Sequence, residues 1–148
     1  MNPEDIARRI VAANNYLTLA TADADGRPWA SPVCYTPSGT DFYWVSRPDS
    51  RHSQNLAVRP EAGIVIFDSQ VALFRAEAVY LNVRAAEVSL DELESCAAIY
   101  SARFPEIDEF GPDRLQEPAP LRLYRASVVE ASVLLDDDGP DFRVPVTL

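Results

Sequence analysis

The sequence predicts a mainly β fold: a six-stranded antiparallel barrel, closed or partly open, with peripheral helices. Short β-prone segments alternate with turn signals along most of the 148 residues. Most connections between these segments are also too short for the crossover that parallel strands need. A closed sheet avoids exposed edges, and a chain of this length suits one core. We therefore expect a single domain over residues 1–148.

The first half of the chain is predicted to form a helix and three antiparallel strands. Asn2 and Pro3, followed by the acidic Glu4 and Asp5, are typical of a helix start. Asp25-Gly26 is a hairpin signal. The expected elements are a helix ending near residue 14, strands at residues 16–21, 28–35 and 41–45, and a turn at residues 37–40.

The second half is predicted to add two helices and the remaining strands. Ser89 with Glu92 three residues later matches a capping box, which predicts a helix at residues 91–103. The acidic residues 136–139 lack the alternating ligands and distal glutamate of a calcium loop, so we expect a turn and no metal site. The other expected elements are a short helix from residue 50 to near 60, strands at residues 63–67, 76–88, 121–135 and 142–147, a loop at residues 104–120 and a turn at residues 136–140.

The composition excludes several classes of function. All 13 basic residues are arginine, which removes the Walker lysine and the lysine of pyridoxal-phosphate enzymes. The single histidine, His52, excludes poly-histidine metal sites, and a Ser-His-Asp triad would have to use this one residue. A net charge of −10 argues against nucleic acid as a partner.

Other features of the sequence bear on location and cysteine chemistry. No apolar run approaches the roughly 18 residues of a membrane span. Glu4 and Asp5 stand where a signal peptide would be basic. We expect a cytoplasmic protein that does not contact a membrane. Cys34 and Cys96 have no metal or redox spacing, so we expect both to be small core residues.

The segment of residues 45–56, which we call the cradle, gathers basic groups and hydroxyls in an otherwise acidic chain. From Arg47 to Arg59, three arginines against Asp49 give a local charge of +2. A helix starting here would offer free N–H groups and the positive end of its dipole, which favour a phosphate. The donors that would assist are Ser46, Arg47, Ser50, Arg51, His52 and Ser53. The alternative is a capped surface helix with solvated arginines.

The order of these segments resembles the pyridoxamine 5′-phosphate oxidase-like family, the flavin-binding split β-barrels. The resemblance covers most of the chain and is carried by residues 16–21 (YLTLAT), 26–33 (GRPWASPV), 50–56 (SRHSQNL) and 59–66 (RPEAGIVI). It implies a six-stranded antiparallel split barrel with Greek-key connections. It also implies an oxidoreductase with FMN as cofactor, and a homodimer with two equivalent flavin sites at the subunit interface.

The resemblance also implies which residues contact the flavin. The isoalloxazine ring would lie along the second strand, lined by Ala30, Ser31, Pro32 and Val33. Val45 and Ser46 would flank the ribityl-phosphate, Ser50, Arg51 and His52 would bind the phosphate with Arg47 nearby, and Asn55 would brace the loop. No protein residue need act as an acid or base, because the cofactor performs the redox step on a small-molecule substrate.

The sequence departs from the family pattern at three places. His52 stands where the family usually has lysine, and Glu77 stands where many members have a flavin-contacting glutamine; a carboxylate there would repel a phosphate. The C-terminal tryptophan and arginine-histidine motif of true pyridoxamine phosphate oxidases is absent, so we do not expect vitamin B6 oxidation. Two alternatives to FMN stay open: the deazaflavin F420, and a non-enzymatic dimeric module that binds a flavin, haem-like or other small anionic ligand.

Overall fold

The structure is a computed structural model that describes residues 1–105, 110–135 and 142–148. The helices are α1 (Pro3–Ala13), α2 (Arg51–Val58) and α3 (Leu93–Ala102), and a 3-10 turn covers Pro112–Arg114. The strands are β1 (Tyr16–Ala22), β2 (Pro28–Cys34), β3 (Thr36–Ser38), β4 (Asp41–Ser46), β5 (Glu61–Phe67), β6 (Ala78–Glu87), β7 (Arg122–Leu134) and β8 (Arg143–Pro145). The turn expected at residues 136–140, and part of the loop expected at residues 104–120, lie outside the described residues.

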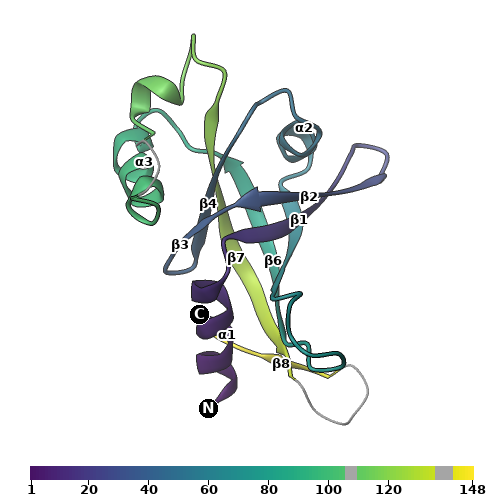
Figure 1. Cartoon of the computed structure of the whole chain (residues 1–148). Coiled ribbons are helices and arrows are strands. Elements are labelled where there is room, and N and C mark those ends of the chain that lie inside the picture. The colour runs from purple at the N-terminus through teal and green to yellow at the C-terminus, as the bar shows by residue number, and fades with distance from the viewer. Residues whose placement is uncertain (106–109, 136–141) are drawn as a thin grey trace.

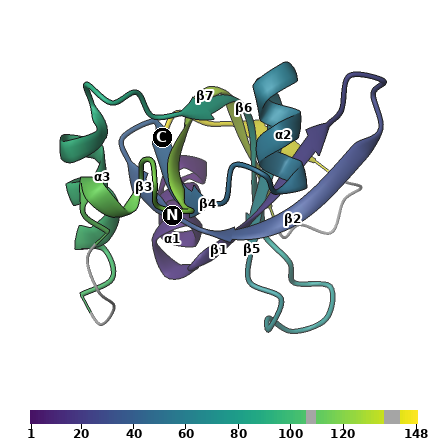
Figure 2. The same ribbon diagram turned by 90° about the horizontal axis from the view of Figure 1, so that it is seen from above.

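All the strands belong to one antiparallel sheet, in the order β2-β1-β5-β6-β7-β4-β3 with β8 added to β7. The sheet curls strongly, so β2 at one end of this order lies against β4 near the other end (Figures 1 and 2). In the described part of the chain no strand ladder joins β2 to β4, and we call this place the seam. The predicted mainly β, antiparallel split-barrel fold is confirmed.

The sheet has eight strands, two more than the six of the predicted barrel. One is β3, where we expected a turn: Thr36–Ser38 pairs with the start of β4, and the chain reverses at Gly39, whose φ of 59° suits glycine. The other is β8 (Arg143–Pro145), which falls within the strand expected at residues 142–147 and pairs with the end of β7.

The capping box predicted at the start of the third helix is wrong. Glu92 is the N-cap of α3, and no side chain caps this helix. The Glu92 carboxylate instead accepts hydrogen bonds of 2.9 and 3.2 Å from the guanidinium of Arg125 on β7. This ion pair ties the start of α3 to the sheet. The Ser89 hydroxyl donates to the same carboxylate at 3.4 Å, so neither side chain caps a backbone N–H of the helix.

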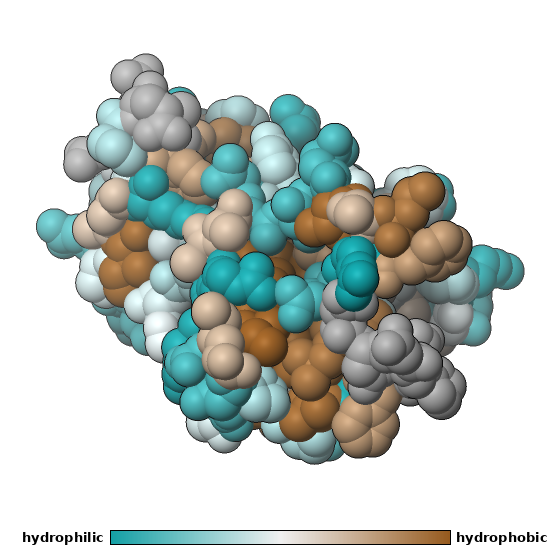
Figure 3. Space-filling view, turned by 60° about the horizontal axis from the view of Figure 1, so that its bottom comes forward, coloured by the Kyte–Doolittle hydropathy of each residue, from teal (hydrophilic) through white to brown (hydrophobic). Residues whose placement is uncertain are grey.

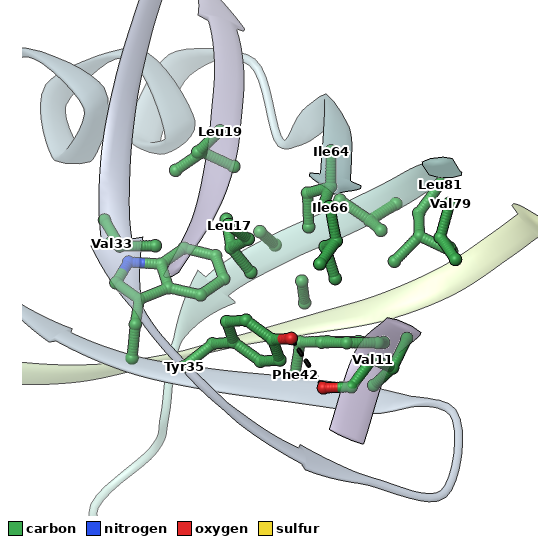
Figure 4. Close-up of a cluster of buried hydrophobic side chains, with 14 of the residues drawn as sticks. Val11, Leu17, Leu19, Val33, Tyr35, Phe42, Ile64, Ile66, Val79 and Leu81 are labelled. Carbon is green, nitrogen blue, oxygen red and sulfur yellow. Dashed lines mark hydrogen bonds between the residues drawn. The ribbon is translucent and has the colours of Figure 1, made fainter. Parts of the chain in front are cut away.

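The larger of two hydrophobic clusters fills the inside of the curled sheet. Successive side chains of a strand point to opposite faces, so Leu17 and Leu19 of β1 and Ile64 and Ile66 of β5 point inward (Figure 4). The smaller cluster lies between α3 and the other face of β4 and β7. The helices α1 and α2 lie at opposite ends of the barrel in Figure 1, so the cradle and the N-terminal helix are far apart.

The two cysteines differ in burial. Cys96 of α3 is buried, as predicted, whereas Cys34 is only half-buried; neither forms a disulfide. Among the described residues, no helix is both long enough and apolar enough to cross a membrane. The cytoplasmic location stays a prediction from the sequence.

Candidate functional site

The cradle begins with a tight turn between β4 and α2. The backbone N–H and the hydroxyl of Ser50 both donate to the carbonyl of Arg47, at 3.2 and 2.8 Å. Ser50 is also the N-cap of α2, and its Oγ accepts from the N–H of Ser53. The N–H groups of Arg51 and His52 belong to the first helical turn, where no intrahelical acceptor exists. With the positive end of the helix dipole, they make this turn suitable for an anion.

His52 bridges the seam of the barrel. Its Nδ1 lies 3.0 Å from Oγ of Ser31 on β2, and its Nε2 lies 2.8 Å from Oγ of Ser46 at the end of β4. One imidazole thus connects the two strands that no ladder joins. Partial burial lowers the pKa of His52 below its usual 6.5, so the ring is neutral at pH 7.

The two arginines of the cradle have different partners. The guanidinium of Arg47 binds both carboxylate oxygens of Asp49, at 3.0 and 3.2 Å, on the exposed side of the turn. This pairing lowers the pKa of Asp49. Arg51 instead lies over the indole of Trp29 on β2, 4.3 Å from the ring centroid. Asp49 therefore competes with any bound anion for Arg47, whereas the partner of Arg51 is an uncharged ring.

Asn55 connects α2 to the sheet. It is buried, and its side-chain amide donates to Oγ of Thr21 on β1 at 3.0 Å. The hydroxyl of Thr21 lies 3.5 Å from the carbonyl oxygen of Trp29. This chain of contacts fixes α2 against β1 and β2, so the cradle sits on a rigid support.

Two of the predicted contact residues differ from expectation. The side chain of Val33 is buried in the main core, because alternation along β2 turns it inward (Figure 4). Val45 packs against the cluster beneath α3, on the opposite face of β4 from Ser46. The side chain of Val33 is therefore closed to a ligand, whereas that of Val45 is half-buried. Ala30 and Pro32 are exposed, as a surface that contacts a flat ring requires.

Glu77 lies far from the cradle of its own chain. Glu77 precedes the first residue of β6. Ser46 lies near the other end of that strand, because Ser46 pairs with the start of β7, and the start of β7 pairs with the last residues of β6. A strand of this length spans about 30 Å at 3.3 Å per residue. The carboxylate of Glu77 accepts a 2.8 Å hydrogen bond from Arg9 of α1. Within one chain, the Glu77 carboxylate is therefore too distant to repel a phosphate bound in the cradle.

The protein family follows from comparison with known proteins. Residues 4–134 match the family model described as pyridoxamine 5′-phosphate oxidase. The chain belongs to the pyridoxamine 5′-phosphate oxidase-like family. No curated protein sequence matches this member of the family significantly.

Solved structures with a similar fold bind different ligands, to judge from their names. A haem-binding protein from Mycobacterium smegmatis superposes with a TM-score of 0.76 at 23% identity, over 98% of this chain and 58% of that one. The haem storage protein HutZ from Vibrio cholerae superposes with a TM-score of 0.73 at 24% identity, over 91% of this chain and 95% of that one. An FAD-binding protein from Mesorhizobium loti superposes with a TM-score of 0.67 at 19% identity, over 85% of this chain and 87% of that one. At these identities the likeness establishes the fold alone.

Two residues of this family member were missed as parts of the site. Trp29, which is not among the predicted contact residues, lies under the guanidinium of Arg51. Asp49 binds the guanidinium of Arg47, a pairing that the sequence did not predict. The alternation of β2 was the available signal for Trp29, because it places Trp29 on the same face as Ser31.

Proposed function

We propose that this protein binds FMN at the seam and acts as a flavin-dependent oxidoreductase, in keeping with its family. The observation that carries the proposal is the grouping of phosphate donors at the start of α2 directly beside β2. Because β2 is the last strand of the sheet, one edge of its backbone has no strand partner in the described part of the chain. A planar ring with polar edges needs such an edge, and a phosphate needs such a helix start.

The residues present suit the chemical groups of FMN. Arg51 and the first N–H groups of α2 would hold the phosphate. The hydroxyls of Ser31 and Ser46, which are hydrogen-bonded to His52, lie next to these donors. Ala30 and Pro32 would contact the ring. The bound flavin would supply the electron transfer, and the chain would bind and orient it. The substrate and the electron donor stay open.

We also propose that the cofactor sites form in a homodimer. The outer face of β1, β5, β6 and β7 carries grooves of about 690 and 500 Å³, which share the small residues Ala20 and Gly63. Val129 in the same grooves is 64% exposed. Figure 3 brings the lower end of the molecule in Figure 1 forward, where further hydrophobic residues are exposed between hydrophilic ones. We expect the molar mass in solution, measured by light scattering, to be twice that of the 16.4 kDa chain; a monomer at all concentrations would contradict this.

Haem is the second candidate ligand. A neutral imidazole is the form that binds iron, and His52 is neutral. Both ring nitrogens are already hydrogen-bonded, so haem binding would have to break one of those bonds, and we therefore favour FMN. The visible spectrum of the purified protein tests the choice: flavin bands or saturable FMN binding support our proposal. A Soret band with no flavin binding would contradict it, and so would a preference for F420 over FMN in competition.

The assignment of Arg51 predicts a specific loss of affinity. Arg51→Ala should weaken FMN binding by roughly tenfold to a hundredfold, because a charge-assisted hydrogen bond contributes about 1.5–3 kcal/mol. Riboflavin, which lacks the phosphate, should bind equally well to both proteins. Arg8→Ala is the matched control, because Arg8 is exposed on α1 at the other end of the barrel. Equal FMN affinity in folded wild-type and Arg51→Ala proteins would contradict the site.

Asp49→Asn should change FMN affinity in the opposite direction to Arg51→Ala. The substitution keeps the size of the side chain but frees Arg47 from its bidentate partner and removes a negative charge from the turn. We expect FMN affinity to rise by about threefold to tenfold, in line with the small energies of exposed ion pairs. A fall in affinity would mean that Asp49 supports the turn more than it competes with the phosphate.

A further inference from the structure

The Ser31–His52–Ser46 bridge has two hydrogen bonds, but its two hydroxyls and neutral imidazole carry three polar hydrogens. In the neutral state, one ring nitrogen of His52 donates and the other accepts. One of the two serines must therefore donate its hydroxyl hydrogen to the ring. Only the other serine has its hydrogen free to point elsewhere.

Protonation changes this distribution. An imidazolium donates from both nitrogens, so Ser31 and Ser46 both become acceptors toward the ring. The distances of 3.0 and 2.8 Å suit either state. Both hydroxyl hydrogens are then free to donate to a neighbouring group. One added proton therefore gives the seam a positive charge and one more outward donor, without breaking the bridge.

We propose that binding of a phosphate monoester in the cradle is coupled to protonation of His52, and that His52 with its two serines distinguishes phosphorylated from phosphate-free ligands. This inference rests on the proposed function and adds that the protein takes up a proton when the ligand binds. The imidazolium would attract the phosphate dianion, and Ser31 and Ser46 would donate to its oxygens. A lysine would carry its charge permanently, whereas His52 takes it from solvent when the anion arrives.

The surroundings of His52 favour this behaviour. Partial burial holds its pKa below 6.5, so the ligand-free ring is neutral and has a proton to gain. The charged groups of the cradle and of the start of β7 have partners: Arg47 binds Asp49, Arg51 lies over Trp29, and Arg122 binds Glu87 and Glu117. A bound phosphate would be the strongest new charge near the ring, and it would raise the pKa of His52.

The direction of the pH effect follows from linkage. If the bound state holds one more proton than the free state, affinity falls as pH rises between the free and bound pKa values of His52. The second pKa of the FMN phosphate is about 6, so its own ionisation acts in the opposite direction. We expect wild-type affinity for FMN to fall by roughly fivefold to tenfold from pH 6.5 to 8. His52→Gln, which keeps a donor and an acceptor between the serines, should lose this fall, and riboflavin affinity should be flat in both proteins.

The single histidine allows a direct test in the wild-type protein. Its Hε1 resonance in a proton NMR spectrum, followed against pH, should have a midpoint below 6.5 without ligand and above 7 with saturating FMN. The midpoint should not change with riboflavin. Calorimetry in buffers of different ionisation enthalpy should detect net proton uptake with FMN near pH 7.5. FMN binding with an unchanged midpoint and no proton uptake would overturn the coupling but leave the proposed function intact. Absence of FMN binding even at pH 6 would overturn both.

Discussion

Replacing Arg103 with alanine is expected to lower the free energy of unfolding by about 3 kcal/mol, which is the upper range for hydrogen bonds that involve a charged group. Arg103 follows α3, and its guanidinium donates to the carbonyls of Val11, Ala12 and Asn14 at the end of α1. It also donates to the carbonyl of Tyr35 and lies over that ring, 4.7 Å from the centroid. The last carbonyls of a helix have no partner within it, and Arg103 satisfies those of α1 together with the Tyr35 hydroxyl, which donates to Val11, and the Asn14 amide, which donates to Ile10.

Thermal and urea unfolding would measure the effect. For a chain of this size, about 3 kcal/mol corresponds to a fall in Tm of roughly 6–12 °C. Arg103→Lys keeps the charge but lacks the planar fork, so we expect it to recover less than half of the loss. Arg8→Ala removes an exposed arginine and should cost within about 0.5 kcal/mol. If Arg103→Ala were as mild as Arg8→Ala, the end of α1 would not depend on Arg103.

The order of the main elements could be predicted because it is written in local patterns. The alternation in β1, the Asp25-Gly26 turn and the Asn2-Pro3 start each act over a few residues, and each is observed. The third helix start failed for a different reason. Ser89 and Glu92 have the right spacing, but Arg125, 33 residues further along the chain, takes the carboxylate. Local patterns do not contain such long-range competition.

The candidate site could be located from the sequence but not resolved into partners. The charge and hydroxyl content of residues 45–56 marked the loop, and the structure brings Ser31, Ser46 and His52 together from three elements. The face on which Val33 and Val45 lie depends on strand register, and register is set by pairing with distant strands. The pairing of Arg51 with Trp29 likewise needs the seam to bring α2 onto β2.

Trp44→Ala is expected to be the most destabilising single substitution that we consider, at about 3–5 kcal/mol. Trp44 of β4 is fully buried and stacks on Tyr124 of β7, with ring centroids 6.1 Å apart and an interplanar angle of 9°. Its side chain is part of the main core. Alanine would leave a large cavity beside Tyr124, two residues before Ser46 and the seam.

Trp44→Phe is the informative comparison. The indole N–H of Trp44 is buried and has no hydrogen-bond partner among the described residues, which costs about 1–3 kcal/mol. Phenylalanine removes this unpaired donor and keeps most of the apolar volume. The gain from removing the donor offsets the cost of the smaller cavity, so the free energy of unfolding should fall by about 1 kcal/mol or less. The two variants should therefore differ by more than 2 kcal/mol in urea unfolding. If phenylalanine costs nearly as much as alanine, the indole N–H has a partner in solution and contributes to holding β4, and with it Ser46, in place.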